Sequence, residues 1–222
     1  MPALPEAFTQ PEFPEISATE AFGEATLVFF DHFDFPTAEQ LAIADQLDGW
    51  SLIRWGGWND TIDVDDVDLE ELASYADEVP DDDAPSLTGL SLNDDGLPNG
   101  EREPQPTINS QDIDELYPEA EGWGLIAIST PSPQAIATLA WQGCINVAEP
   151  HEMATAVEQW NQRFGVEVLA FGAEEDSDTL LLRIPDHSST DEDLLQALAT
   201  AADQVNLYHD PDLGQLASLW FD

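Results

Sequence analysis

The feature that most constrains this chain is a run of negative charge. Residues 60–83 hold twelve Asp and Glu side chains and no basic one. The whole sequence has 47 acidic residues against four Arg and no Lys, which gives a formal net charge of -43 over 222 residues. Such a chain repels itself when compact, so we expect its stability to rise with salt. It also repels nucleic acid and anionic lipid, so we expect no direct nucleic-acid or membrane partner.

The apolar content of the chain nevertheless predicts a folded protein. Hydrophobic residues make up 42% of the sequence, and seven Trp and ten Phe are present, whereas disordered chains have few aromatic residues. The first residues lack the charged and apolar regions of a signal peptide, and no apolar run reaches the ~20 residues of a membrane-spanning helix. We therefore expect a cytoplasmic protein. Cys144 is the single cysteine, so no intrachain disulfide forms.

Three explanations compete for the acidity. Carboxylates hold water and cations at high salt, so the composition fits halophilic adaptation. They also attract a basic protein, and they bind divalent ions. Charge runs are most often solvated faces. The scarcity of Arg as well as Lys favours a basic partner, because a salt-adapted surface still has room for Arg in ion pairs.

Composition divides the chain into four segments. Residues 1–23 form a Pro-rich N-terminal arm that we expect to pack loosely or not at all. Residues 24–80 predict a small α/β unit with an acidic helix, and residues 81–120 a Pro/Gly-rich acidic linker or long loop. Residues 121–222 predict a C-terminal α+β domain.

The first unit has clear local signals. Residues 25–30 form an apolar run of strand length, and a second strand is predicted from Trp50 to Trp55. Thr37 and Gln40 have the spacing of a capping box, which predicts that a helix begins there.

The C-terminal domain predicts the order β-α-α-β-β-α. Its first strand covers residues 124–129, Pro150 begins the longer of two helices, and Gly165 ends it. Residues 166–172 and 179–184 predict an antiparallel hairpin. A long helix then begins at Thr190, and Leu213, Leu216 and Trp220 suggest a short terminal helix.

These elements predict an α+β fold, a mainly antiparallel sheet with helices packed on one face. Residues 54–59 and 140–146 share a Trp, a Gly and an Asn. The chain is therefore expected to hold two units that are either related or merely adjacent.

Several motifs of the last hundred residues occur in a recognisable order. They are the turn Trp141-x-Gly143-x-x-Asn146, a helix end Trp160-x-x-Arg163-Phe164-Gly165, two strands, Pro185, an Ala-rich helix over residues 197–202, Pro211-Asp212 and a terminal Trp220-Phe221-Asp222. This order resembles a bacterial family known as domain of unknown function 4253, over about residues 121–222. The resemblance implies a shared fold unit and no particular activity. The family pattern has a Cys before the Pro-Asp pair, where this chain has Tyr208-His209-Asp210.

The acidic run is the candidate partner-binding surface. Trp58 precedes it, and Trp is enriched among residues that dominate binding energy. The candidate residues are Trp58, Asp60, Asp63, Asp65, Asp66, Asp68, Glu70 and Glu71. The alternative is a solvated helix face, since carboxylates also suit a helix N-terminus.

A second candidate site would bind a small ligand through the scarce arginines and the Trp turns. Its residues are Trp141, Asn146, Trp160, Arg163 and Arg183. This hypothesis predicts a pocket in which the two Arg converge. The alternative places the Trp side chains in the core and pairs Arg163 with a carboxylate at a helix C-terminus, where a cation suits the dipole.

One segment of the sequence is similar to a calcium-binding loop in the order of its oxygen-bearing side chains. Asn93, Asp95, Asn99 and Glu101 alternate as oxygen ligands in the sequence. A full calcium loop needs Asp at the first position and a bidentate Glu at the twelfth, where this chain has Ser91 and Arg102. We therefore expect no metal and no cofactor, with calcium as the weak alternative.

No catalytic signature occurs in the sequence. We expect a non-enzymatic protein that neutralises or masks a basic protein, like an immunity protein or a nucleic-acid-mimicking inhibitor. Two alternatives stay open. One is a salt-adapted protein with no charge-specific partner, and the other is a small-ligand or enzymatic role of the C-terminal domain.

Overall fold

A computed structural model describes residues 4–31, 35–55, 107–108, 124–144, 148–171, 179–188 and 191–221. Its strands are β1 (Ile16–Phe22), β2 (Ala25–Phe30), β3 (Ser51–Trp55), β4 (Thr107–Ile108), β5 (Gly124–Ile128), β6 (Glu167–Phe171), β7 (Thr179–Ile184), β8 (Gln204–Asp210) and β9 (Gly214–Trp220). Its helices are α1 (Ala38–Ala44), α4 (Ser132–Thr138), α5 (Pro150–Phe164) and α6 (Glu192–Ala201), with short 3₁₀ helices η1 (Glu6–Thr9) and η4 (Gln142–Cys144).

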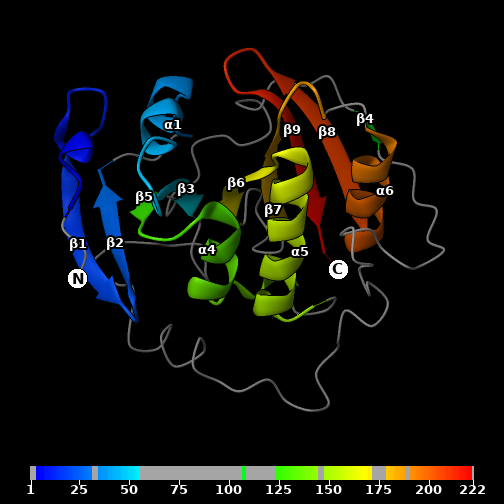
Figure 1. Ribbon diagram of the computed structural model, residues 1–222, viewed down its shortest axis with the longest axis horizontal. Helices are drawn as coiled ribbons and strands as arrows, with labels where there is room; N and C mark the ends of the chain where they lie inside the picture. Colours follow the sequence, from blue (N-terminus) through cyan, green and yellow to red (C-terminus); the bar gives the residue numbers. More distant parts are fainter. Residues whose placement is uncertain are drawn as a thin grey trace.

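The described strands form one nine-stranded sheet in the order β1-β2-β5-β3-β6-β7-β9-β8-β4 (Figure 1). Neighbouring strands are antiparallel except for the pairs β3–β6 and β4–β8, which are parallel. The α+β class with a mainly antiparallel sheet is therefore as predicted. No helix within the described ranges is long and apolar enough to cross a bilayer.

Both faces of the sheet are covered by a hydrophobic core. Successive side chains of a strand point to opposite sides, so each central strand contributes to both cores. On β7, Leu180 and Leu182 belong to one hydrophobic core and Leu181 to the other. We call the side covered by α4, α5 and α6 the helical face, and the opposite side the α1 face. Trp160 is a central residue of the core on the helical face.

Helix α1 departs from the prediction that the helices share one face. Its buried residues Leu41 and Ala44 belong to the core of the α1 face, whereas the other three helices pack on the helical face. The capping box at its start is confirmed. Thr37 Oγ1 accepts a hydrogen bond from Gln40 N at 3.2 Å, and Gln40 Oε1 accepts one from Thr37 N at 2.8 Å.

The N-terminal segment is packed, contrary to the expectation of a loose arm. Strand β1 pairs with β2 along its length, and the Phe8 ring of η1 is fully buried in the core of the α1 face. That ring makes edge-on contacts with Phe13 and Trp50, each at 5.2 Å between ring centroids. The aromatic side chains stabilise this segment, although its sequence has no helical or strand period.

The predicted short terminal helix is wrong, because residues 204–220 form the antiparallel hairpin β8–β9. The Asp210 carboxylate accepts hydrogen bonds from the backbone N–H groups of Asp212 and Leu213, at 2.8 and 2.7 Å, and so closes the turn. Gly214 follows with a φ of 83°, a conformation that favours glycine. The helical spacing of Leu213, Leu216 and Trp220 was therefore coincidental.

The described strands of the two predicted units join in a single sheet. Strand β5, from the predicted C-terminal domain, lies between β2 and β3 of the first unit (Figure 1). Strand β4, within the predicted linker, pairs with β8. The first unit and the C-terminal domain therefore share one sheet.

Candidate functional site

A cleft opens where the parallel strands β3 and β6 separate. Only Arg54–Ala170 and Trp55–Phe171 are paired between these strands, so their first residues diverge. The cleft has a volume of about 430 Å³. It is lined by Leu41, Ala44, Asp45, Leu47, Asp48, Gly49, Trp50, Ser51, Leu52, Pro131, Ser132, Pro133, Asn161, Glu167 and Val168.

Polar side chains hold the walls of this cleft in place. Ser132 Oγ, at the start of α4, accepts a hydrogen bond from Val168 N at 3.2 Å. Ser51 Oγ donates to the Thr130 carbonyl at 2.7 Å, and Asn161 Nδ2 donates to the Val166 carbonyl at 2.7 Å. The cleft is therefore built by specific bonds between side chains and backbone.

The cleft is acidic. Asp45, at the C-terminal end of α1, and Asp48, in the turn that follows, are exposed, whereas Glu167 at the start of β6 is half-buried. Arg183 Nη1 lies 3.3 Å from Glu167 Oε2, but Arg183 does not line the cleft. Three carboxylates thus face the cleft beside one arginine.

The surroundings of Asp45 and Glu167 disfavour the charged forms of their carboxyl groups. Partial burial of the carboxyl groups raises the pKa of both above their ordinary values, although Asp45 as a whole residue is exposed, and Arg183 partly offsets this effect. The negative charge of Asp45 raises the pKa of Glu167 further. The two carboxylates are therefore close enough to repel each other.

This pair makes folding stability depend on pH in a defined direction. The protonated forms of both carboxyl groups favour the folded state. Their contribution to stability is complete below the ordinary pKa values, 3.8 for Asp45 and 4.5 for Glu167, and is lost as the pH rises through the raised pKa values of the folded state. We therefore expect Glu167→Gln at neutral pH to unfold at a slightly higher urea concentration than the wild type. The change should stay below ~1 kcal/mol, because Glu167 is partly solvated.

The matched control for this prediction is Glu20→Gln. Glu20 is exposed on the edge strand β1, outside the cleft, and its replacement changes the net charge equally. If Glu167→Gln unfolds at a lower urea concentration than Glu20→Gln, the ion pair with Arg183 outweighs burial and the prediction is wrong.

An aromatic side chain completes the cleft. Trp50 lines it, is half-buried and contacts the Phe8 ring, which fixes the position of the indole. An indole beside carboxylates provides two groups that attract a cation, the carboxylate charge and the π face of the ring. The cleft is therefore suited to an organic cation.

The tryptophans proposed as ligand contacts lie in the core of the helical face. Trp141 is 5% exposed, stacks on Phe171 at 5.6 Å and meets the Phe221 ring edge-on at 5.7 Å. Trp160 is fully buried. These positions agree with the alternative that assigned them to the core.

The two candidate arginines do not converge. Arg163 Nη2 lies 2.6 Å from Asp193 Oδ2, on the side of the sheet that carries α5 and α6. Arg183 alternates with Leu182 and Ile184 of the helical face, so it points to the α1 face, where it pairs with Glu167. The described residues therefore form no pocket that holds both arginines.

Several predicted residues lie outside the described ranges. They are the partner-binding set (Trp58, Asp60, Asp63, Asp65, Asp66, Asp68, Glu70 and Glu71), Asn146, and the calcium set (Asn93, Asp95, Asn99 and Glu101). Within the described ranges, no group of three or more His, Cys, Asp or Glu could hold a metal ion.

Sequence reasoning named Arg183 but missed Asp45, Asp48, Trp50 and Glu167. In a chain with 47 acidic residues, no single carboxylate stands out. The one local signal in the sequence is the dipeptide Asp48-Gly49, which is typical of a turn, and in the structure Gly49 has a φ of 73°.

Comparison with protein-family models gives a match in the C-terminal half of the chain. Searches of curated proteins and of solved structures found no match. The matched segment runs from β5 into the β8–β9 turn, so it supplies the α4, α5 and β6 walls of the cleft. The segment is residues 124–211, and its family is described as Domain of unknown function (DUF4253), which confirms the resemblance seen in the sequence.

Proposed function

We propose that this protein is a non-enzymatic, cytoplasmic binding protein that neutralises or masks a basic protein partner through its acidic surface. The observation that carries the proposal is the net charge of -43. A partner of opposite charge is attracted over distances of about a Debye length, which accelerates encounter.

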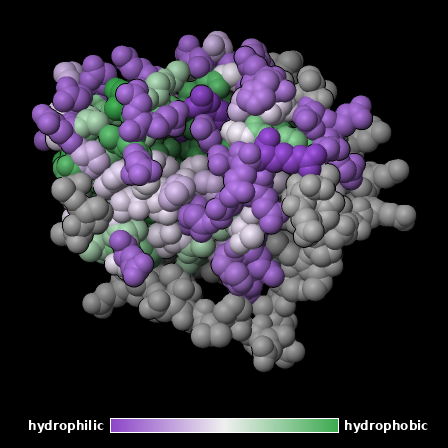
Figure 2. All heavy atoms as spheres, viewed as in Figure 1, coloured by the Kyte–Doolittle hydropathy of each residue, from purple (hydrophilic) through white to green (hydrophobic). Residues whose placement is uncertain are grey.

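The described arginines leave this negative charge largely uncompensated. Arg163 and Arg183 each pair with a carboxylate, and Arg54 is 2% exposed. Figure 2 shows hydrophilic residues over much of the described surface in that view. Among the described residues, Leu4 is the only exposed large hydrophobic side chain. Charge, rather than an apolar patch, would therefore drive association with this part of the molecule.

The test is affinity capture from a lysate of the source cells at low and at high salt, with mass spectrometry of the eluate. The proposal predicts one basic protein in stoichiometric amount, released at high salt. A diffuse set of basic proteins, with a bait that needs high salt to stay folded, would overturn it.

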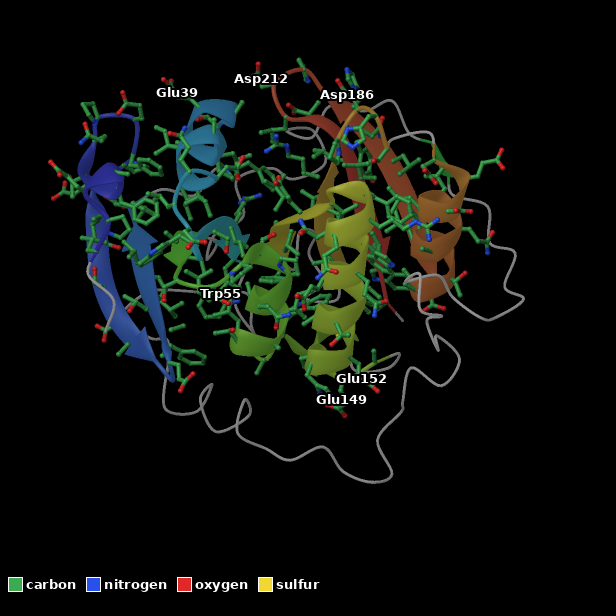
Figure 3. All side chains as sticks on the ribbon, in the orientation of Figure 1. Glu39, Trp55, Glu149, Glu152, Asp186 and Asp212 are labelled. Atoms are coloured by element: carbon green, nitrogen blue, oxygen red, sulfur yellow. The ribbon has the colours of Figure 1, made fainter. Side chains whose placement is uncertain are left out.

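The second candidate function is that of a salt-adapted protein without a charge-specific partner. The distribution of carboxylates favours it. In Figure 3, the labelled residues Glu39, Asp186 and Asp212 lie along the upper side of the described part of the chain, and Glu149 and Glu152 lie along its lower side. Such spread is expected when the charge serves solvation of the whole surface. The capture experiment separates the two functions.

A further inference from the structure

We propose that the cleft between α1, α4 and the starts of β3 and β6 binds the guanidinium group of an arginine side chain presented by the basic partner. This inference rests on the proposed function and gives it a specific site. It assigns a ligand class to Asp45, Asp48, Trp50 and Glu167, which carry the recognition.

The dimensions of the cleft fit a side chain better than a bare ion. Its volume of about 430 Å³ lies in the usual range of ligand pockets, roughly 300–1,000 Å³. Its three carboxylates do not form a group that could hold a metal ion. Acceptors spaced along a cleft suit a planar group with several N–H donors, which can bond to more than one carboxylate at once.

The net negative charge of the cleft also favours a positively charged ligand. Three carboxylates less one arginine, Arg183, leave two negative charges uncompensated at this place. Glu167 is already half-buried, so part of its hydration is lost before a ligand arrives. A guanidinium group between Asp45 and Glu167 would relieve their mutual repulsion and replace the missing water with hydrogen bonds.

Guanidinium is preferred to ammonium for two reasons. It is more weakly hydrated, so it enters a cleft at a lower desolvation cost, and its planar face stacks on aromatic rings. Trp50 supplies such a ring in the cleft wall. The hydrogen bonds of Ser132 and Asn161 hold the other walls, so little ordering is needed on binding.

The test uses the full chain and isothermal titration calorimetry at low salt. The probe is N-acetyl-arginine amide, and the control ligand is N-acetyl-citrulline amide, which has nearly the same shape without the charge. We expect the arginine probe to bind and the citrulline probe not to bind. Asp45→Asn and Glu167→Gln should each weaken arginine binding about tenfold or more, because each removes a charge-assisted hydrogen bond.

The control variant is again Glu20→Gln, which should bind the arginine probe as the wild type does. Equal loss in Glu20→Gln and in the cleft variants would mean general attraction to the acidic surface and would overturn the inference. No binding of the arginine probe, or equal binding of both probes, would also overturn it. So would calcium chloride binding in the cleft at low micromolar concentration, with the same loss in the cleft variants.

The outcomes separate this inference from the proposed function. If a basic partner is captured equally by the wild type and by the Asp45→Asn and Glu167→Gln variants, the cleft is not its site and the inference fails alone. If the arginine probe binds in the cleft but no basic protein is captured, the proposed function fails, and so does the assignment of the guanidinium to a protein partner.

Discussion

Trp160→Ala is expected to lower the free energy of unfolding by about 3–5 kcal/mol, the usual effect of removing a large buried aromatic side chain. The Trp160 side chain is fully buried in the core between α5 and the sheet. Its truncation removes apolar contacts and leaves a cavity that close-packed neighbours fill only in part. Urea denaturation followed by far-UV circular dichroism measures the change.

Two further variants control for this prediction. Gln162→Ala alters an exposed residue of the same helix and should change stability by less than ~0.5 kcal/mol. Trp160→Phe should destabilise less than Trp160→Ala, since a ring remains and the Trp160 Nε1 has no hydrogen-bond partner to lose. A Trp160→Ala protein as stable as Gln162→Ala would contradict the assignment of this residue to the core.

Salt is expected to stabilise the protein strongly. With a net charge of -43, the folded chain concentrates repulsion that the unfolded chain spreads over a larger volume. Raising the ionic strength from ~0.1 M to ~1 M shortens the Debye length from ~10 Å to ~3 Å and screens that repulsion. We expect the free energy of unfolding to rise by more than ~1 kcal/mol, the upper end of what one exposed ion pair contributes.

The cation used in the salt titration separates screening from ion binding. Sodium chloride and choline chloride at equal ionic strength should stabilise alike if screening is responsible. A much larger effect of sodium would indicate bound cations, as expected of salt adaptation. A stability that does not change, or falls, with salt would contradict the view that charge repulsion limits this fold.

The elements with a strong local pattern were predictable from the sequence. In α5, Met153, Val157, Trp160 and Phe164 recur at helical spacing and all are buried. Gly165, with a φ of 75°, ends this helix as its position indicated. The hairpin of β6 and β7 also followed from apolar runs of strand length.

Elements that depend on distant partners were not predictable. Strand β1 alternates poorly, and its pairing with β2 became visible only in the sheet. The insertion of β5 between β2 and β3 joins segments far apart in the sequence. The position of Leu216 fits a helical pattern as well as a strand pattern. The turn closed by Asp210 places it in β9, where it pairs with β8.

The candidate site depends on tertiary structure even more. Asp45 and Glu167 come from opposite halves of the chain and line the same cleft, which opens where β3 and β6 are no longer paired. No local motif marks either residue among so many carboxylates. Arg183 was noticed for its rarity, but its partner Glu167 followed only from the strand register.

The salt dependence of association tests the central claim most directly. Stopped-flow measurement of the purified chain with the captured basic protein gives the association and dissociation rates at several ionic strengths. We predict that the association rate is fast at low salt and falls toward the ~10⁵–10⁶ M⁻¹ s⁻¹ of uncharged pairs as salt rises, while the dissociation rate changes less. An association rate that does not depend on salt would contradict binding through the acidic surface.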